Sequence, residues 1–214
     1  MTVWKSQVGI HRKGFEWEGL DDRGWAIRYE HNNVKISSRE EPRLLRIKVK
    51  KISETEAEFS APNFRSLKVK LDSDPANEVS SIHIFGQDVD CEDIGDEAAD
   101  WASEYIGKRS RMSFKPHGRP CRSYYKKNWR LSSNPVQDLD RANFQDGYPY
   151  HILGCDSLDE VNRKIPKRKF TMNNFRPNIV VKAENGRPWD EDGWKGILQI
   201  GGAKFAMASP KFRW

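Results

Sequence analysis

The chain has 214 residues, of which 36% are hydrophobic and 32% are charged, and its formal net charge is +6. This length suits one large domain or two small domains that pack together. The mixed signs of the charges argue against disorder by self-repulsion, and the lack of any run of about 18 apolar residues argues against a transmembrane helix.

The first half of the chain is predicted to form short strands. Apolar and polar residues alternate imperfectly over residues 44–52, as in a strand with one buried face. The turn-prone sequence His31-Asn32-Asn33 separates predicted strands at residues 25–29 and 34–36. Further strands are predicted at residues 57–59, 67–71 and 82–85. Together these segments predict a meander of mostly antiparallel strands that forms curled sheets or a small barrel.

A helix is predicted to open at Asp93 or Gly95 and to close at Gly107. Carboxylates fill its first turn, apolar residues recur at helical spacing, and glycine often follows the last turn of a helix. A second helix is predicted from Ser157, as its N-cap, to Ile165. The remaining predicted strands are residues 112–114, 150–153, 178–182, 197–200 and 204–207, and residues 116–135 are expected to form an irregular basic connection.

We therefore expect an α+β protein that is mostly β, with a few helices. No internal repeat or linker marks a clean boundary, and the best division follows the first helix. This predicts two domains, residues 1–108 and residues 109–214, packed together as one unit.

Cysteine usage indicates the cellular compartment. Cys91, Cys121 and Cys155 are odd in number and far apart, with no C-x-x-C pair. This pattern favours a reducing compartment and argues against a structural zinc site. Because the first six residues also lack the features of a secretory signal, a cytoplasmic location is expected.

The charged residues form two neighbouring blocks of opposite sign. All charged residues from Asp88 to Glu104 are acidic, and all those from Lys108 to Arg130 are basic. Such blocks favour mutually paired or solvated faces over an anionic-ligand pocket or a nucleic-acid surface. No recognised nucleic-acid motif is present, so no nucleic-acid partner is expected.

A series of short segments runs through the chain in a fixed order. The segments are Val3-Trp4-Lys5-Ser6, Gly19-Leu20-Asp21-Asp22-Arg23-Gly24-Trp25, Ser38-Arg39-Glu40-Glu41-Pro42-Arg43-Leu44, Gly95-Asp96-Glu97-Ala98-Ala99-Asp100-Trp101, Phe114-Lys115-Pro116, Asp146-Gly147-Tyr148-Pro149-Tyr150 and Asn174-Phe175-Arg176-Pro177-Asn178. Through this series, nearly the whole chain resembles the molybdenum-cofactor sulfurase C-terminal (MOSC) family, and its amidoxime-reducing members in particular. The resemblance implies an N-terminal MOSC-like domain followed by part of a MOSC β-barrel.

The resemblance also implies an anion site. In the family, the matching lysine, serine and two arginines surround the phosphate of the pterin cofactor, and here they correspond to Lys5, Ser6, Arg23 and Arg176. A guanidinium group binds phosphate through two parallel hydrogen bonds, and a lysine adds a point charge. The alternative is a structural role, in which the arginines pair with carboxylates such as Asp21 or Asp22.

Three departures from the family pattern argue against molybdenum chemistry. Family members carry a segment of the type Ala-Cys-Ser/Pro-Arg-Cys, whose second cysteine binds molybdenum, whereas this chain reads Ala208-Ser209-Pro210-Lys211-Phe212. A phenyl ring cannot replace a thiolate. Gly147-Tyr148 stands where the family has threonine or serine donors. The sequence also stops at Trp214, before the last barrel strands, so residues 205–214, a partner or a second copy in a homodimer is expected to cover the open edge.

Other groups of reactive residue types are better explained by structure. His151 and Cys155 have no third residue to orient a base, so a packed pair is favoured over a nucleophilic dyad. His117 is favoured as an exposed loop histidine over a general acid. The run Asp190-Glu191-Asp192 could form an acid/base pair, but the family keeps acids at this turn around a packed tryptophan, which favours a structural role.

These observations predict a pocket without metal or other cofactor that binds an organic substrate. Hydrogen-bond donors in a dry pocket lower barriers by orientation and charge stabilisation, which suits a cofactor-independent cyclisation, pericyclic rearrangement or isomerisation in secondary metabolism. The predicted catalytic residues are Arg23, Arg176, Tyr148 and Lys5, and the predicted substrate-binding residues are Ser6, Trp25, Asn174, Phe212 and Trp214.

Two alternatives stay open. In the first, the chain retains the molybdenum–pterin cofactor and reduces N-oxygenated compounds with electrons from a haem or flavin partner. In the second, it binds a small molecule without changing it.

Overall fold

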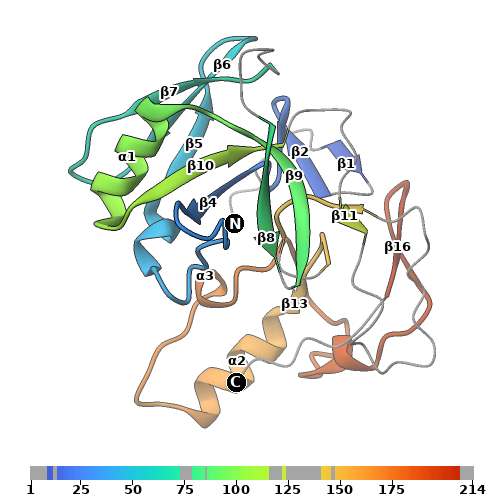
Figure 1. The fold of residues 1–214 in the computed structure, drawn as a ribbon. Coiled ribbons are helices and arrows are strands. Elements are labelled where there is room, and N and C mark those ends of the chain that lie inside the picture. Colours follow the sequence, from blue (N-terminus) through green and yellow to red (C-terminus); the bar gives the residue numbers. More distant parts are fainter. Residues whose placement is uncertain are drawn as a thin grey trace. The chain divides into compact units, whose positions relative to one another are not determined.

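The computed structural model describes residues 9–11, 14–72, 79–84, 86–115, 122–123, 141–145 and 148–207. The chain divides into two compact units, of which the first comprises residues 1–123 and 141–146, and the second residues 124–140 and 147–214. Each unit is an arrangement of small sheets with few helices, which confirms the mostly β fold class (Figure 1). The sheets of the described residues are open and form no closed barrel. The predicted domain boundary after residue 108 stays a prediction.

The first unit is built from antiparallel sheets of two to four strands. The sheet orders are β1-β2-β3, β4-β10-β9-β8, β5-β6-β7 and β11-β12. The elements are β1 (Gly9–His11), β2 (Gly14–Trp17), β3 (Leu20–Asp21), β4 (Trp25–Tyr29), the 3₁₀ helix η1 (Pro42–Arg46), β5 (Lys48–Lys51), β6 (Glu56–Ser60), β7 (Leu67–Lys70), β8 (Val79–Ile84), β9 (Gln87–Asp93), α1 (Asp96–Ile106), β10 (Ser110–Phe114), β11 (Arg122–Ser123) and β12 (Arg141–Ala142).

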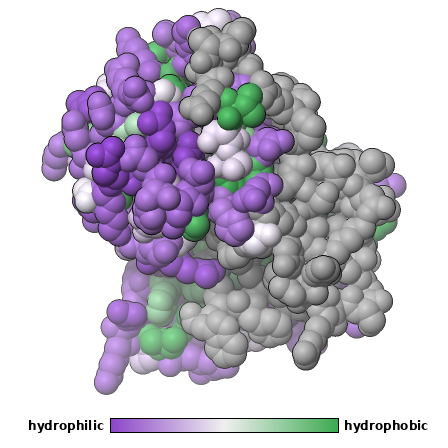
Figure 2. Space-filling view, viewed as in Figure 1, coloured by the Kyte–Doolittle hydropathy of each residue, from purple (hydrophilic) through white to green (hydrophobic). Residues whose placement is uncertain are grey.

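Helix α1 confirms the predicted helix that closes at Gly107, and of the two predicted starts Gly95, not Asp93, is its N-cap. Asp96 and Glu97 lie in its first turn, where the helix dipole favours carboxylates, and Gly107 ends it in the left-handed conformation. Its apolar side packs into the first unit's larger core cluster, where the fully buried Trp101 also donates a hydrogen bond to the Arg65 carbonyl at 2.7 Å. Figure 2 shows mostly hydrophilic side chains over the face of this unit around α1.

Two strand predictions in the first unit were wrong in part. Residues 42–46 form a 3₁₀ helix, because Pro42 presets its first turn and the Glu41 carboxylate accepts the Arg43 N–H; the strand starts only at Lys48. Residues 34–36 form no strand of their own. They make isolated bridges, Arg28 with Lys35 and Val34 with His83, and the Ile36 N–H donates to the Ile27 carbonyl at 2.8 Å.

The second unit contains a parallel strand pair that the predicted antiparallel meander did not include. The pair is β13 (Ile152–Gly154) with β14 (Ile179–Val181), and the helices α2 (Cys155–Lys164) and α3 (Met172–Phe175) lie between them in the chain. A parallel pair needs such a crossover connection. The unit continues with the 3₁₀ helix η2 (Asp190–Gly193) and the antiparallel hairpin of β15 (Ile197–Ile200) and β16 (Ala203–Ala206).

Helix α2 starts earlier than predicted. Gly154 is its N-cap, and Ser157 lies inside its first turn, fully buried. Ser157 does not cap the helix. Its hydroxyl instead accepts the Trp189 N–H at 2.8 Å, from a partner 32 positions away in the chain. None of the helices in the described part of the chain is both long enough and apolar enough to cross a membrane.

Candidate functional site

Arg23 lies at the tip of a tight turn between β3 and β4. The Gly24 N–H donates to the Asp21 carbonyl at 3.1 Å, which closes the turn. Arg23 occupies its third position with a φ of 53°, in the left-handed region where glycine or asparagine is usual. Its Nη1 donates to the Asp22 carboxylate at 2.6 Å, and its side chain is 30% exposed. The pairing considered as the structural alternative is therefore present, and the guanidinium still reaches solvent.

The segment Asn143-Phe144-Gln145, far away in sequence, supports this turn. The side-chain amides of Asn143 and Gln145 donate to the Asp22 carbonyl at 3.4 and 3.3 Å. The Phe144 N–H donates to the Arg23 carbonyl at 3.3 Å. All three residues are 1% exposed, so buried hydrogen-bond donors, two side-chain amides and one backbone N–H, hold the turn. No local motif marked these residues as functional in the sequence.

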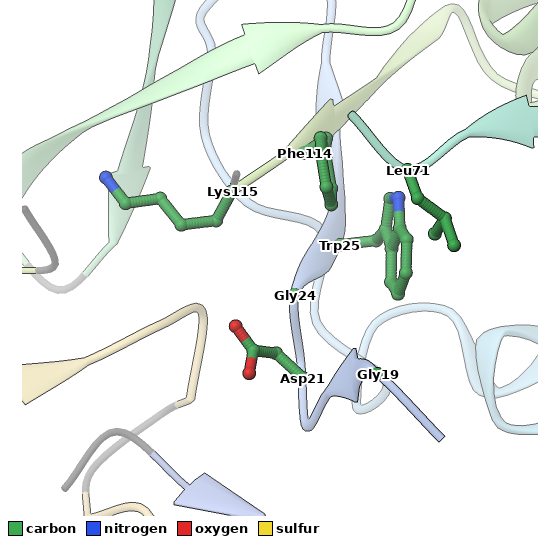
Figure 3. Close-up of a pocket in the computed structure, with 7 residues that line it drawn as sticks. All are labelled: Gly19, Asp21, Gly24, Trp25, Leu71, Phe114 and Lys115. Carbon is green, nitrogen blue, oxygen red and sulfur yellow. The ribbon is translucent and has the colours of Figure 1, made fainter. Parts of the chain in front are cut away.

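Trp25 packs into the core directly after the turn. Its ring stacks on Phe114 at a centroid distance of 5.1 Å and meets the edge of Phe59 at 5.5 Å. The rings of Trp25 and Phe114 border a small cavity, shown in Figure 3, whose other lining residues are Gly19, Asp21, Gly24, Leu71 and Lys115. The cavity measures about 10 Å³, room for about one water molecule, so an organic substrate does not fit inside. A substrate contact by Trp25 stays a prediction.

Arg176 caps the end of α3 in the second unit. Its φ is 55°, again left-handed, and its N–H donates to the Met172 carbonyl at 2.8 Å. Thr171 starts the same short helix with a reciprocal capping box, in which the Asn174 side-chain oxygen accepts the Thr171 N–H at 2.8 Å. Asn174, predicted to bind substrate, thus also serves as a helix cap. Tyr148 belongs to this second unit as well and is partly buried.

Two groups weighed in the sequence lie around the start of α2. The Gly154 N–H donates to the Glu191 carboxylate at 2.8 Å, and the Trp194 indole donates to Asp190 at 3.2 Å. Burial and the neighbouring Glu191 raise the pKa of Asp192. Cys155 begins the helix, and the His151 N–H donates to the Asn178 side chain at 3.0 Å. The carboxylates of Asp190 and Glu191 thus hold η2 and the helix start, as the structural interpretation predicted.

The opposed charge blocks pair with each other in the first unit. Arg111 donates two hydrogen bonds to Asp93, at 2.6 and 2.8 Å, and a third to Asp96 at 3.1 Å. Arg28, only 4% exposed, also donates to the Asp93 carboxylate at 2.6 Å. Burial opposes the ionised form of Asp93, but these hydrogen bonds, the Gly95 N–H and the two positive charges outweigh it and lower its pKa.

Several predicted residues lie outside the residues that the structure describes. They are Lys5, Ser6, His117, Phe212 and Trp214. Of the four predicted catalytic residues, Arg23 belongs to the first unit, and Arg176 and Tyr148 belong to the second.

Comparison with known families and proteins gives a consistent result. Residues 4–109 match the MOSC N-terminal beta barrel domain, and residues 140–213 match the MOSC domain. Mitochondrial amidoxime-reducing component 1 of Mus musculus is 28% identical over 195 residues, which cover 90% of this chain and 54% of the relative. Mitochondrial amidoxime reducing component 2 of Homo sapiens is 31% identical over 213 residues, covering 96% and 59%. The chain thus spans about half the length of these relatives.

A third relative carries a different name. Molybdenum cofactor sulfurase of Drosophila melanogaster is 26% identical over 191 residues, which cover 88% of this chain and 22% of that protein. Similarity along most of this chain is therefore found in relatives with different names, the amidoxime-reducing components and a molybdenum cofactor sulfurase.

Proposed function

This chain belongs to the MOSC family, with both domains matched in order, and we propose that Arg23 in its first unit and Arg176 in its second unit are each side chains that bind a small organic anion, without a molybdenum–thiolate centre. The observation that carries the proposal is the backbone of these two arginines. Both are held in the left-handed region, at φ values of 53° and 55°, where a long side chain is unfavourable. Such conformations cost on the order of 1–3 kcal/mol and cluster at binding sites.

Simple structural needs do not call for arginine at these two positions. Asparagine or glycine fits a left-handed turn position or helix end at lower cost. The family resemblance assigns both side chains to phosphate binding, which gives a reason for keeping a strained arginine. A guanidinium group offers paired donors that match phosphate and carboxylate oxygens.

The test compares asparagine variants at strained and ordinary positions. Inorganic phosphate and acetate serve as probes in calorimetric titrations of the whole protein. Arg23→Asn and Arg176→Asn should each weaken binding of at least one probe about tenfold or more, the scale of a charge-assisted hydrogen bond. Arg39→Asn and Arg168→Asn remove the same charge from exposed arginines of ordinary backbone and should leave the affinity unchanged. Equal losses in all four variants would sink the assignment.

In its catalytic form, the proposal is a cofactor-independent cyclisation, pericyclic rearrangement or isomerisation. The guanidinium donors would stabilise the negative charge that develops on a substrate carbonyl or carboxylate. Such a reaction has a single reactant and needs no oxidant or reductant. Compounds that copurify with the protein, followed by liquid chromatography and mass spectrometry during long incubation, should change retention time at constant mass. A compound recovered unchanged would instead indicate a binding protein.

The donor set fits molybdenum poorly. The resemblance places Phe212 at the thiolate position, and a phenyl ring donates no electron pair to a metal. Of the two cysteines in the described part, Cys91 is fully buried and its pKa is raised by burial, and Cys155 begins helix α2. No three histidine, cysteine, aspartate or glutamate side chains gather into a metal site among the described residues.

The relatives nevertheless favour a second candidate, a molybdenum-cofactor-dependent reductase of N-oxygenated compounds. Two of them are named as amidoxime-reducing components and match along most of this chain. Elemental analysis for molybdenum and fluorescence of oxidised pterin on natively purified protein separate the candidates. Near-stoichiometric molybdenum and pterin would restore the reductase and overturn the first proposal, whereas absence of both from a cofactor-competent host would support it.

Three further proposals concern the cellular location of the protein, its binding to nucleic acid and its oligomeric state. We propose a cytoplasmic protein, because its three cysteines are far apart and form no C-x-x-C pair. We propose that it binds no nucleic acid, because its clustered charges pair within the described part of the first unit. We also propose a homodimer, since the open sheets leave strand edges that a second copy could cover. Light scattering on a chromatographic peak gives the mass directly, and a strict monomer at all concentrations would refute the dimer.

A further inference from the structure

Arg23 is held in place from both sides of its own backbone. The Asp22 carbonyl belongs to the peptide plane that precedes Arg23, and the Arg23 carbonyl belongs to the plane that follows it. The torsions φ and ψ at the Arg23 Cα set how these two rigid planes are oriented relative to each other. Fixing both carbonyls therefore fixes the left-handed conformation itself.

Residues 143–145 bind both of these carbonyls. Asn143 Nδ2 and Gln145 Nε2 converge on the Asp22 oxygen, and the Phe144 N–H reaches the Arg23 oxygen. A carbonyl oxygen has two lone pairs, so the two amides match its full accepting capacity. The Asp22 N–H, in turn, donates to the Phe15 carbonyl at 2.7 Å.

The supporting segment is itself anchored in the first unit. Phe144 is 1% exposed and belongs to a core cluster with Ala26, Ile82, Ile84, Val89 and Cys91. Its carbonyl accepts a hydrogen bond from Lys35 Nζ at 2.7 Å. A strained residue keeps its conformation only where its surroundings determine it in this way.

We propose that Asn143 and Gln145 are positioning residues, whose amides hold the Arg23 backbone in its left-handed form and thereby aim its guanidinium for anion binding. The inference rests on the proposed function of Arg23 as an anion-binding side chain. Fixing a binding group before the ligand arrives removes part of the ordering cost of association. Asn143 and Gln145 contribute to affinity through Arg23 and do not need to touch the anion.

The experiment is a double-mutant cycle with inorganic phosphate as the probe. Asn143→Leu and Gln145→Met, near-isosteric changes that remove the donors, are made singly and together, in the wild-type chain and in Arg23→Asn. In the wild-type background the double change should weaken phosphate binding about tenfold, the scale of coupling within one network. In the Arg23→Asn background it should have no effect on phosphate affinity. Equal weakening in both backgrounds, or in neither, would overturn the inference.

A second measurement distinguishes a loss of the Arg23 backbone conformation from a general loss of stability. The Cα and Cβ chemical shifts of Arg23 report its backbone conformation in each folded variant. They should move away from left-handed values in Gln145→Met and Asn143→Leu, together with the loss of affinity. If the melting temperature falls while these shifts and the phosphate affinity stay unchanged, the amides have a structural role only and the inference fails.

The outcome separates this inference from the proposed function. If Arg23→Asn itself leaves phosphate and acetate affinity unchanged, the proposed role of Arg23 fails. If Arg23→Asn weakens binding but the Asn143 and Gln145 variants do not, only the positioning role fails.

Discussion

The two left-handed arginines reach the same backbone conformation by different means. Arg176 ends a four-residue helix whose capping box and last hydrogen bond all lie within residues 171–176. Arg23 depends on amides that lie 121 and 123 positions away from Asp22 in the chain. The second unit therefore builds its arginine position locally, whereas the first unit needs its tertiary structure to be complete. This difference predicts which variants disturb which arginine.

The largest expected effect follows removal of the buried ring under the Arg23 turn. Phe144→Ala should lower the free energy of unfolding of the first unit by about 3–5 kcal/mol, because it leaves a cavity in the core. Urea unfolding combined with hydrogen exchange should show loosening around Arg23 and normal protection around Arg176. Phe175→Ala is the matched control, since Phe175 is only partly buried and packs on Phe170. An equal loss in both variants would contradict the comparison.

The next largest expected effect is a loss of stability of the first unit at acidic pH. Because the folded-state pKa of Asp93 lies below its unfolded value, its contribution to stability is present above the unfolded pKa and is lost as pH falls through the folded pKa. The first unit should thus lose stability below about pH 4. Asp93→Asn should cost about 1.5–3 kcal/mol at neutral pH, the scale of a hydrogen bond to a charged group. It should also flatten this pH dependence in hydrogen exchange of β9.

Asp192 provides the opposite case in the second unit. Its folded-state pKa is raised, by burial and by Glu191, so its ionisation destabilises the fold and acidification through this range relieves that cost. Asp192→Asn should therefore slow hydrogen exchange of η2 at neutral pH and have less effect near pH 3. Faster exchange at neutral pH would show that the Asp192 carboxylate stabilises η2.

A smaller effect is expected at the locally built arginine. Thr171→Ala removes half of the capping box and should lower the free energy of unfolding of the second unit by about 1 kcal/mol. Thr171→Ser keeps the hydroxyl and should cost much less. Hydrogen exchange around Arg176 should rise in the alanine variant while that around Arg23 stays unchanged. A change at Arg23 would show that the two arginine positions are coupled.

The smallest effect tests the backbone strain itself. Arg176→Asn and Arg23→Asn should each raise the free energy of unfolding by about 0.5–1 kcal/mol, because asparagine tolerates the left-handed region better. Chemical denaturation measures this gain, and the control Arg168→Asn should show none. A gain in stability together with a loss of anion affinity is the combination expected of a residue kept for function.

Local sequence patterns predicted the parts of the fold that depend on neighbouring residues. Helix α1 was predicted from its acidic first turn, its apolar spacing and Gly107, all of which act within a few residues. The MOSC resemblance was likewise readable from short segments, and the family comparisons confirm it. The adjacent opposite charge blocks favoured mutually paired or solvated faces, and the structure shows Arg111 of the basic block paired with Asp93 and Asp96 of the acidic block.

Other elements depended on distant partners. The start of α2 was misplaced because Ser157 bonds to Trp189, and the parallel pairing of β13 with β14 joins segments separated by two helices. The capping and pairing preferences of a short segment carry no information about such partners.

For the candidate site, the sequence by itself determined which residue types are present: the two arginines through the family resemblance, and Phe212 at the thiolate position. Only the tertiary structure decided that Arg23 is left-handed and that Asn143 and Gln145 support it, whereas the left-handed Arg176 ends a helix whose capping contacts lie within residues 171–176. The physical reason is that a backbone conformation of unfavourable local energy needs compensating contacts, and for Arg23 those contacts come from more than a hundred residues away.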